Sequence, residues 1–410
     1  MSEILFLAHR VPFPPNRGDK IRSYHLLKAL TRLGPVHVGC FWESEEDRQA
    51  NAEVERVSAS HCVLQRSKPL ALAGVEAVLS GKPVSITAFH NVALEKWVAR
   101  TIAERPISAI VIFSCQMGQY IPGDFTGRVV IDLCDVDSAK FEEYAATGER
   151  VWLNAREARL LAAEEQRLAH RADAVTLISG SEAAVFRRRM KAHAATNLVV
   201  MGNGIDAETF NRRDVAALAE LLATTGPHFV FTGQMDYRPN EAAALWAAEN
   251  FMPLTQERFR EAQFHVVGRN PTAALKALHG KHGVRVWGEV PDVRPFLAAA
   301  SCAVVPLQIA RGIQNKVFEA MAMECPVLLT PEAATGIEAH DGKDWMVERA
   351  DARAMLDRFG KLWADPKAAQ AMGQKARRFV LEHHAWDTQL APLQELVTGE
   401  PRTEEGRSAA

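Results

Sequence analysis

Short, uninterrupted apolar runs alternate with amphipathic helical patterns along most of this chain, and that alternation limits the folds open to it. Runs such as "ILFLA" (4–8) and "VVIDL" (129–133) lack the in–out alternation of an antiparallel sheet with one exposed face. Strands that are apolar on both sides and separated by helices are typical of parallel sheets covered on both faces. We therefore predict an α/β fold built from doubly wound sheets.

The predicted strands form two series, one on either side of "MGNGIDAETFNRRD" (201–214), in which Asn203-Gly204 is a strong turn signal. A chain of 410 residues is also long for one compact core. We predict a Rossmann-like domain over residues 1–205 and a second over 206–384, facing each other across a cleft that receives ligands at the carboxyl ends of the strands. The predicted strands are 4–8, 36–41, 109–113, 129–133, 174–178 and 197–200 in the first series, and 228–232, 263–267, 284–287, 302–306 and 326–329 in the second.

The end of the chain falls outside both series. Residues 385–398, "AWDTQLAPLQELVT", are predicted to form a helix that returns to the N-terminal domain, and the polar residues 399–410 to be disordered.

Composition excludes several classes of function. The formal net charge of −2 gives no reason to propose a nucleic-acid partner. The first residues lack the basic region and small-residue cleavage site of a signal peptide, and no apolar run approaches the roughly 18 residues of a membrane span. The six cysteines have no paired spacing, which indicates reduced thiols. We expect a cytoplasmic protein, with peripheral contact at the inner face of the cytoplasmic membrane left open.

Several catalytic motifs are missing from the sequence. The first strand is followed by "HRVPFPPNRGDK" (9–20), without Gly-x-Gly-x-x-Gly, and no Gly-Lys-Ser/Thr loop occurs, which disfavours dinucleotide and NTP binding. Ser179 and Ser181 follow no nucleophile elbow, so one of them is better explained as a helix N-cap.

Two further patterns keep alternative interpretations open. Asp135 and Asp137 could orient a polar substrate or bind a metal, but turn and capping roles are common for aspartates in such a loop, and no third metal ligand can be named. The basic stretch "FRRRMKAHAA" (186–195) could contact anionic lipid or could be a solvated helix face.

The stretch "CAVVPLQIARGIQNKVFEAMAMECPVLLT" (302–330) gives the clearest functional signal. An apolar strand ends in a glycine-containing loop, and a helix begins near Asn315, with Glu319 one turn after Lys316. Unpaired N–H groups at a helix start behind a glycine, with cations beside them, favour binding of an anion. The alternative is an intrahelical Lys316–Glu319 salt bridge, which would contribute only about 0.2–0.5 kcal/mol.

These patterns resemble the retaining glycosyltransferases of family four, which have the two-domain GT-B fold. "RGIQNKVFEAMAMECPVLLT" (311–330) is similar to the family's Glu-x7-Glu donor-site pattern, and "VVMGNGID" (199–206) to its interdomain junction. "FTGQMDYRPNEAAALW", "FHVVGRNP" and "VRVWGEVPDVRPFLAAASCAVVPL" follow in the family's order. The resemblance covers about residues 1–395. The head, "FLAHRVPFPPNRGDKIRSYHLLKAL", and "ARGIQNKVFEAMAM" are closer to sugar transferases associated with exopolysaccharide and PEP-CTERM export systems.

The chain departs from the family pattern at charged positions. The first glutamate of the pair falls on Arg311, so only Glu319 carries over. The family's Gly-Arg…Lys reads Gly233-Gln234, with the lysine position near Asn240. Substitute cations for the missing Arg and Lys are available at Arg238, Arg269, Arg311 and Lys316.

The resemblance and the residues together assign candidate roles. The catalytic candidates are Lys316, Arg311 and Asp135. The donor-binding candidates are Glu319, Gly312, Ile313, Gln314, Asn315, Gly233, Gln234, Arg238, Arg269 and Val290, and the acceptor-side loop is Gly18, Asp19 and Lys20. The resemblance places Glu319 on the ribose hydroxyls and the loop 288–290 beside the nucleobase. No cofactor or metal is expected, because fixed cations and helix N–H groups can neutralise a leaving diphosphate.

We therefore expect a retaining, hexosyltransferase-type, metal-independent glycosyltransferase. It would move a sugar from a UDP- or GDP-sugar to a saccharide or lipid-linked acceptor in exopolysaccharide or cell-surface glycan synthesis. A nucleotide-sugar epimerase of the same fold and a non-catalytic sugar-binding protein remain alternatives.

Overall fold

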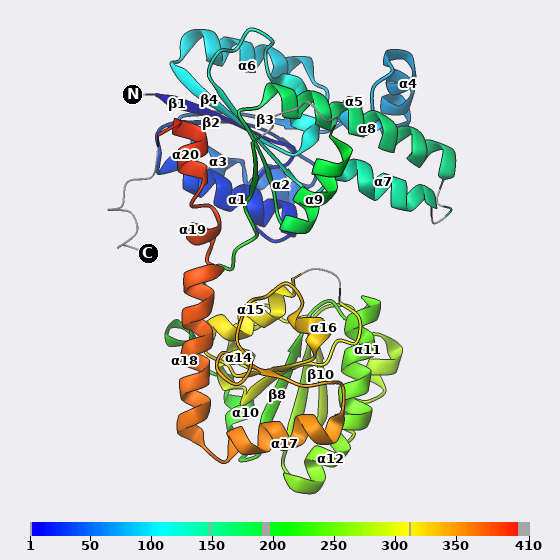
Figure 1. Cartoon of the computed structure of the whole chain (residues 1–410), viewed down its shortest axis with the longest axis vertical. Helices are drawn as coiled ribbons and strands as arrows, with labels where there is room; N and C mark the ends of the chain where they lie inside the picture. The colour runs from blue at the N-terminus through cyan, green and yellow to red at the C-terminus, as the bar shows by residue number, and fades with distance from the viewer. Residues whose placement is uncertain (1, 147, 149, 191–196, 311–312, 401–410) are drawn as a thin grey trace. The chain divides into compact units, whose positions relative to one another are not determined.

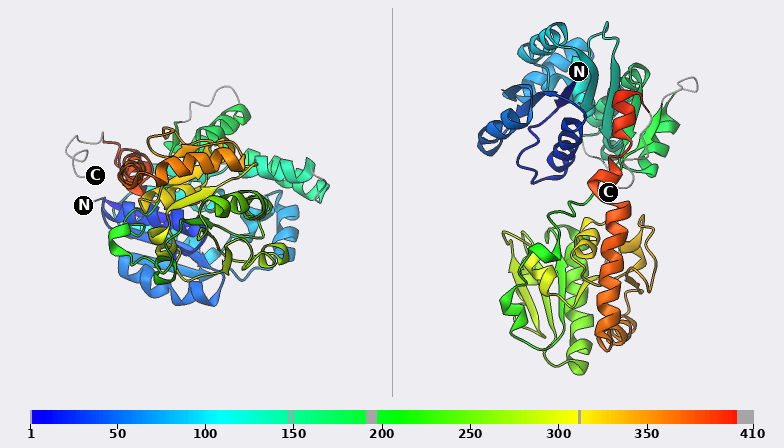
Figure 2. Two further views of the ribbon diagram at one scale, coloured as in Figure 1. Left: turned by 90° about the horizontal axis from the view of Figure 1, so that it is seen from below. Right: turned by 90° about the vertical axis from the view of Figure 1, so that its left-hand side faces the viewer.

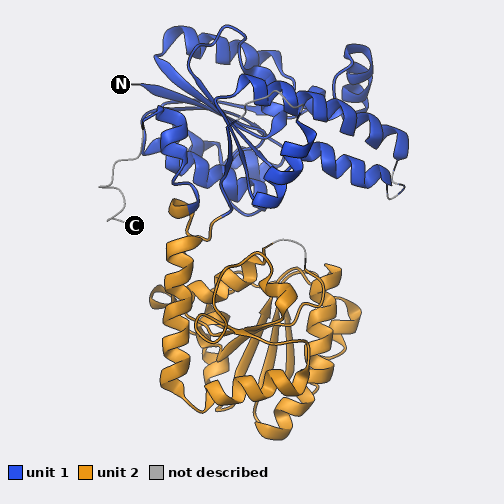
Figure 3. Ribbon diagram, viewed as in Figure 1, with its two compact units in different colours: residues 1–203, 389–410 blue, residues 204–388 orange. Residues whose placement is uncertain are grey.

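A computed structural model describes residues 2–146, 148, 150–190, 197–310 and 313–400. The chain divides into two compact units (Figure 3). Unit 1 consists of residues 1–203 and 389–410, and unit 2 of residues 204–388. The divisions lie at 203/204 and 388/389, whereas the sequence predicted 205/206 and 384/385.

Unit 1 is a parallel sheet whose described strands follow the order β3-β2-β1-β4-β5-β6-β7, with helices on both faces (Figure 1, Figure 2). The strands are β1 (Glu3–Ala8), β2 (Val36–Trp42), β3 (Ser60–Gln65), β4 (Ile107–Phe113), β5 (Arg128–Cys134), β6 (Ala174–Leu177) and β7 (Leu198–Val200). The helices are α1 (Gly18–Thr31), α2 (Glu45–Gln49), α3 (Asn51–Val57), α4 (Leu70–Ser80), α5 (Val84–Ala88), α6 (Val92–Glu104), η1 (Cys115–Tyr120), α7 (Asp137–Ala146), α8 (Val151–Arg171), α9 (Gly180–Arg189) and α20 (Leu393–Thr398).

Unit 2 is a second parallel sheet, in which the described strands follow the order β10-β9-β8-β11-β12-β13. Its strands are β8 (His228–Thr232), β9 (Gln263–Val267), β10 (Val284–Gly288), β11 (Cys302–Val305), β12 (Val327–Leu329) and β13 (Met346–Val347). Its helices are η2 (Arg212–Asp214), α10 (Ala219–Leu222), α11 (Arg238–Trp246), η3 (Ala247–Phe251), α12 (Met252–Arg258), α13 (Ala273–Lys276), α14 (Arg294–Ala299), α15 (Asn315–Ala322), α16 (Pro331–Ala334), α17 (Ala352–Trp363) and α18 (Pro366–His383). The two doubly wound sheets confirm the predicted fold class, while the cleft between the domains stays a prediction.

The predicted strands match the structure, and the two strands that the sequence did not reveal lie at sheet edges. β3 is half-buried along most of its length, and β13 spans two residues. An edge strand is covered on fewer sides than a central one, so it needs no continuous apolar run that would reveal it in the sequence.

The predicted helix over 385–398 is wrong as a single element. α18 ends at His383, and two short helices follow, α19 (Trp386–Gln389) and α20. Pro392 is the N-cap of α20, where its missing N–H costs no helical hydrogen bond. Within unit 1, α20 packs on β4, β5 and α1, and the Arg128 Nε donates to the Leu396 carbonyl oxygen (2.8 Å). The predicted disordered tail falls mostly on residues 401–410, outside the described residues.

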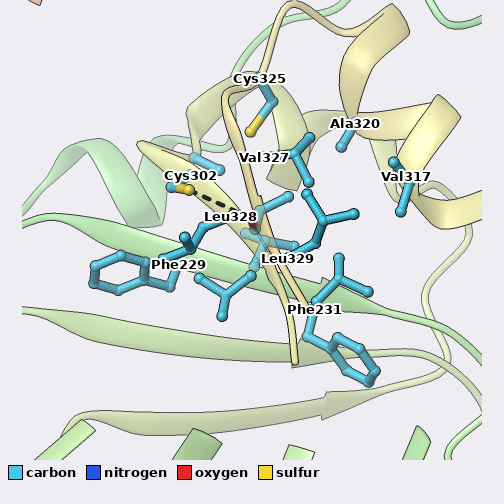
Figure 4. Close-up of a cluster of buried hydrophobic side chains, with 14 of the residues drawn as sticks. Phe229, Phe231, Cys302, Val317, Ala320, Cys325, Val327, Leu328 and Leu329 are labelled. Atoms are coloured by element: carbon cyan, nitrogen blue, oxygen red, sulfur yellow. Dashed lines mark hydrogen bonds between the residues drawn. The ribbon is translucent and has the colours of Figure 1, made fainter. Parts of the chain in front are cut away.

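The core of unit 2 explains the position of α15. Phe229, Phe231, Leu328 and Leu329 on the strands are buried, and Val317 and Ala320 of α15 pack in the same core (Figure 4). Because this face of α15 is apolar, the helix is fixed on the sheet while its polar first turn is left at the carboxyl ends of the strands.

The Ser179 N-cap and the reduced cysteines agree with the sequence predictions. Ser179 is the N-cap of α9, and its Oγ accepts from the Glu182 N–H (3.1 Å). All six cysteines are free thiols. Among the described helices, none combines the length and the apolarity needed to cross a bilayer.

Candidate functional site

Three glycines lie at the carboxyl ends of neighbouring strands β8, β9 and β10, and they let the backbones approach closely. Gly233 and Gly268 have φ values of +150° and +148°, which the backbone of residues other than glycine rarely adopts. A Cβ on Gly268 would lie 1.7 Å from the carbonyl oxygen of Gly233. The Gly268 N–H donates to the Gly288 carbonyl oxygen (2.8 Å). At this edge of the sheet, which we call the glycine edge, there is therefore little side-chain bulk and the backbone itself forms the surface.

The first turn of α15 faces the same region. Gln314 is its N-cap residue in an extended conformation, and Asn315 and Lys316 begin the helix. The first N–H groups of a helix have no partner within the helix. Gln314 and Asn315 therefore lie where a helix start can bind an anion, as the sequence indicated.

Lys316 is held by neutral groups. Its Nζ donates to the Asn240 Oδ1 and lies over the Phe231 ring, 4.6 Å from the centroid. A Cβ on Gly233 would lie 3.2 Å from this Nζ, so the ammonium lies directly against the glycine edge. Burial lowers the pKa of Lys316 to about 8, against the opposing effect of Glu319. The ammonium is thus partly desolvated, and within the described residues no carboxylate lies in ion-pair contact with it.

Glu319 lies one turn further along α15 and is half-buried. The described residues contain no Lys316–Glu319 ion pair, so the salt bridge considered as an alternative does not form. Burial raises the pKa of Glu319, and the nearby Lys316 charge opposes that rise. No described residue donates a hydrogen bond to the Glu319 carboxylate.

The loop after β8 positions Asn240 and connects to the loop after β9. The Asn240 Nδ2 donates to the Gln234 carbonyl oxygen (2.9 Å), so both ends of this amide are used. The Arg269 Nη2 donates to the Gln234 Oε1 (2.8 Å). Arg269 and Arg238, the first residue of α11, are exposed at this edge. The structure therefore brings Gly233, Gln234 and Arg269 into one region with Lys316.

The remaining predicted donor-binding residues differ in where they lie. Arg311 and Gly312 lie outside the described residues. Ile313 is exposed, and a Cβ on Gly336 would lie 3.4 Å from its Cγ1. Val290, after β10, is half-buried and packs against the core of unit 2.

A cavity of about 630 Å³ adjoins Ile313 through Gly336, and no sequence pattern predicted it. Its lining comes from the loop after α16 and the last turns of α18, and includes Glu338, Lys343, Lys375 and Arg378. It carries charges of both signs, and nothing in it selects a ligand.

In unit 1, the acceptor-side loop is held by its own ion pairs. The Asp19 carboxylate accepts from Arg10 (2.7 Å) and Arg17 (2.7 Å), and the His9 Nε2 lies 3.3 Å away. Burial disfavours the charge of Asp19, but His9 and Arg10 outweigh it and lower its pKa. Gly18 begins α1 and is exposed, with open space at its Cβ position.

The expectation for Lys20 is wrong. Its side chain is 3% exposed and forms an ion pair with Asp47, and its Nζ also donates to the Phe13 carbonyl oxygen (3.2 Å). Because a buried ammonium must be paired, Lys20 holds α1 against α2 and does not face a ligand.

Asp135 follows β5 in unit 1, in the loop before α7. Burial raises its pKa, with Lys140 opposing. Asp137 is the first residue of α7 and lies 3.4 Å from the Lys140 Nζ. Within the described residues no group of three or more His, Cys, Asp or Glu side chains could hold a metal ion.

The sequence did not reveal that Phe231 and Asn240 hold Lys316. Phe231 reads as an ordinary core residue of β8, and Asn240 as a departure from the family pattern. The contact could have been predicted from the sheet order. β8 and β11 are neighbours in a doubly wound sheet, so the residues that follow the two strands come together.

Comparisons with known proteins agree with this architecture. Residues 226–365 match the sequence model of the family "Glycosyl transferases group 1". No curated protein matches the chain by sequence.

Solved structures are similar to the whole chain. The sucrose-phosphate synthase of Thermosynechococcus elongatus aligns with a TM-score of 0.60 at 18% identity and full coverage of both chains. Anabaena Alr3699/HepE in complex with UDP and glucose aligns with a TM-score of 0.61 at 14% identity, over 98% of this chain and 100% of that one. WaaG, a glycosyltransferase involved in lipopolysaccharide biosynthesis, aligns with a TM-score of 0.60 at 17% identity, over 97% and 100%. At these identities the likeness shows the fold, which is that of GT-B glycosyltransferases.

Proposed function

We propose that this protein is a glycosyltransferase whose unit 2 binds a nucleotide-diphosphate sugar at the carboxyl ends of β8, β9 and β11. The match of residues 226–365 to a glycosyltransferase family and the GT-B fold support the class of enzyme. The observation that carries the proposal is the position of Lys316, whose ammonium lies against Gly233 with only an amide and an aromatic ring to hold it.

Lys316 supplies the charge that the family pattern places elsewhere. The resemblance puts a lysine near position 240, where this chain has asparagine. Lys316 reaches Asn240 from α15, so a cation is present beside that position although it comes from a different helix. An asparagine oxygen orients the ammonium without neutralising it, which keeps its charge for a diphosphate.

The reaction needs such charges because negative charge builds on the leaving diphosphate as the anomeric carbon–oxygen bond breaks. The ammonium of Lys316 and the first N–H groups of α15 stabilise that charge where it develops. Each well-placed donor of this kind contributes about 2–4 kcal/mol of transition-state stabilisation. Arg269 and Arg238 lie at the same edge and add further positive charge.

Glu319 is proposed to bind the ribose hydroxyls. Its carboxylate is half-buried, lies on α15, and accepts no hydrogen bond from the described residues. A carboxylate can accept from two vicinal hydroxyls, and a bound ribose would then satisfy it.

More specific proposals concern the donor sugar nucleotide, the stereochemistry of transfer and the biosynthetic role. Alr3699/HepE was solved with UDP and with UDP-glucose, which supports a UDP-sugar as the first donor to test, ahead of a GDP-sugar. Transfer of a hexosyl group with retention, independence of metal, and a saccharide or lipid-linked acceptor of surface-glycan synthesis rest on the family resemblance. A thermal-shift screen with UDP-, GDP-, ADP- and dTDP-sugars identifies the base, since a bound donor raises the melting temperature.

Calorimetry tests the site itself. Lys316→Ala and Glu319→Ala are each expected to weaken donor binding by about tenfold or more, because each removes a charged hydrogen-bond partner of the ligand. Lys281→Ala is the matched control, since Lys281 is an exposed lysine of the same unit in the turn before β10. Unchanged affinity in both site variants would show that the donor binds elsewhere.

Product analysis distinguishes a glycosyltransferase from the two alternative functions, an epimerase and a non-catalytic binding protein. Incubation with donor and an acceptor panel should give a new glycoside. Formation of an epimer from donor alone would make the protein an epimerase, and donor binding without turnover on any acceptor would make it a binding protein.

A further inference from the structure

Helix α4 in unit 1 has its large apolar side chains on the outside. Leu72, Val75 and Leu79 recur at the i, i+3, i+7 spacing of one helix face and are 49%, 57% and 83% exposed. Leu70 and Val78 are also exposed, while the residues that α4 buries against the protein are the small Ala73 and Ala77. Burial of apolar surface within unit 1 therefore does not explain the composition of α4.

The beginning of α8 continues this apolar surface. The Arg156 Nη2 on α8 donates to the carbonyl oxygens of Ala77 (2.7 Å) and Lys82 (3.2 Å), which fixes α8 beside the end of α4. Trp152, one turn before Arg156 and so on the same face of α8, is 72% exposed. Figure 1 shows α4 at the margin of unit 1 next to the first half of α8. We call the exposed residues Leu70, Leu72, Val75, Val78, Leu79, Val151, Trp152 and Leu153 the α4/α8 face.

In the described segments 68–82 and 150–159, the charged side chains that have no partner are positive. In the described segments 68–82 and 150–159, both acidic side chains are already bound. Glu76 pairs with Lys68 (2.7 Å), and buried Glu157 accepts from the N–H groups of Val84 and Ser85. Lys82, Arg150 and Arg159 are exposed and have no partner among the described residues.

We propose that the α4/α8 face docks on the surface of an anionic lipid bilayer. An exposed stripe of leucine and valine with a tryptophan beside it and cations around it is the pattern of a helix lying in a membrane interface. The exposed cations match the negative headgroups. α4 has 11 residues and is about 16 Å long at 1.5 Å per residue, too short to span a bilayer, so it lies in the plane of the interface. The inference does not depend on the proposed donor site, which belongs to unit 2.

Co-sedimentation with vesicles tests the apolar part. The full chain should bind vesicles that contain phosphatidylglycerol more strongly than vesicles of phosphatidylcholine alone, and salt should weaken the difference. The double variant Leu72→Gln, Leu79→Gln should lose about tenfold or more in vesicle affinity, since two large apolar side chains no longer enter the interface. The matched control Leu222→Gln, Leu381→Gln changes two exposed leucines of unit 2 and should bind like the unaltered chain.

Two further measurements locate the contact. Lys82→Glu with Arg150→Glu should reduce binding to phosphatidylglycerol vesicles and its salt dependence. Lipids with brominated acyl chains should quench Trp152 fluorescence, and the quenching should be lost in Trp152→Phe.

Other outcomes overturn the proposal. Equal vesicle binding by the Leu72→Gln, Leu79→Gln variant, or no vesicle binding by the full chain, would rule out docking through this face. Self-association in sedimentation velocity that the same variant abolishes, without vesicle binding, would mean that a second copy covers α4. Each variant is also assayed for UDP-glucose binding, so a failure of the donor proposal and a failure of the docking proposal are distinguished.

Discussion

The ammonium of Lys316 on α15 is bound by the side-chain oxygen of Asn240 on α11, 76 residues earlier in the chain. Phe231 lies beneath the same ammonium, and no carboxylate among the described residues neutralises it. A neutral amide and an aromatic face stabilise a cation while leaving its charge available to a ligand. This contact places a usable positive charge beside the glycine edge of unit 2.

Donor affinity should depend on pH through Lys316. Burial lowers its folded-state pKa to about 8, so the ammonium begins to lose its proton above that pH. A bound diphosphate favours the protonated form, so affinity should be full below about pH 8 and fall as the pH rises, by up to about tenfold per unit. Calorimetric titration of UDP-glucose between about pH 7 and pH 10 measures this. Lys316→Arg should remove the dependence, because arginine stays protonated.

Gly268→Ala should destabilise unit 2 by about 3 kcal/mol or more. The new Cβ would lie 1.7 Å from the Gly233 carbonyl oxygen, and the φ of +148° adds backbone strain. Denaturant unfolding followed by circular dichroism measures the loss. Gly342→Ala is the control, because it also has a positive φ but open space at its Cβ position, and it should cost only about 1 kcal/mol. Similar costs for both variants would contradict the close approach of the two strand ends.

Arg22→Ala should destabilise unit 1 by about 3–5 kcal/mol. The guanidinium is 1% exposed and binds both oxygens of Asp132, with its shortest contact at 2.7 Å, and it also donates to the carbonyl oxygen of Met201 (2.8 Å). Removing Arg22 leaves the buried Asp132 charge unpaired. The double variant Arg22→Ala, Asp132→Ala should therefore cost less than the sum of the single variants, and denaturant unfolding of all three measures that coupling.

An exposed pair provides the comparison for Arg22. Arg48 and Glu45 are both more than half exposed, so water screens the pair and Arg48→Ala should leave the stability almost unchanged. An equal cost for Arg22→Ala would show that burial of the Arg22–Asp132 pair has no energetic consequence.

Stability of unit 1 should fall between about pH 5 and pH 7 through Glu165. Burial raises its folded-state pKa to about 7, with Asp137 adding to the rise, while hydrogen bonds from Ser138 and the charge of Arg189 oppose it. A carboxyl with a raised pKa binds a proton more tightly in the folded state than in the unfolded one. Its deprotonation therefore costs stability as the pH rises, up to about 3 kcal/mol.

Glu165→Gln tests this directly. Glutamine stays neutral and its Oε1 can still accept from the Ser138 N–H, so the variant should lose less stability between pH 5 and pH 8 than the unaltered chain does. Denaturant unfolding at the two pH values measures it. Parallel pH profiles for the two proteins would mean that Glu165 ionises at an ordinary pKa.

Much of the fold follows from local patterns. The buried strands β1, β4, β5 and β8 are covered on both faces, so each must be a continuous apolar run, and such runs are readable without knowledge of their neighbours. The junction at Asn203-Gly204 is likewise a local turn signal. β3 and β13 were not predicted, because an edge strand does not have to be a continuous apolar run.

Some residues of the candidate site could likewise be predicted from local patterns, and others could not. A helix start after a buried strand and a glycine loop is a local feature, so Gln314, Asn315 and Lys316 could be named from the sequence. Lys20 could not be assigned correctly, because its partner Asp47 comes from another helix and burial is not visible in the polar stretch around it.

The sequence by itself therefore determined two doubly wound sheets and the helix that carries Lys316, because apolar periodicity and turn chemistry act between near neighbours. Only the tertiary structure decided that Lys316 meets Asn240 and Phe231, that Arg22 meets Asp132, and that α4 leaves its leucines uncovered. Those outcomes depend on which distant segments the sheet order brings together and on which charges lose their water, and no local pattern in the chain contains that information.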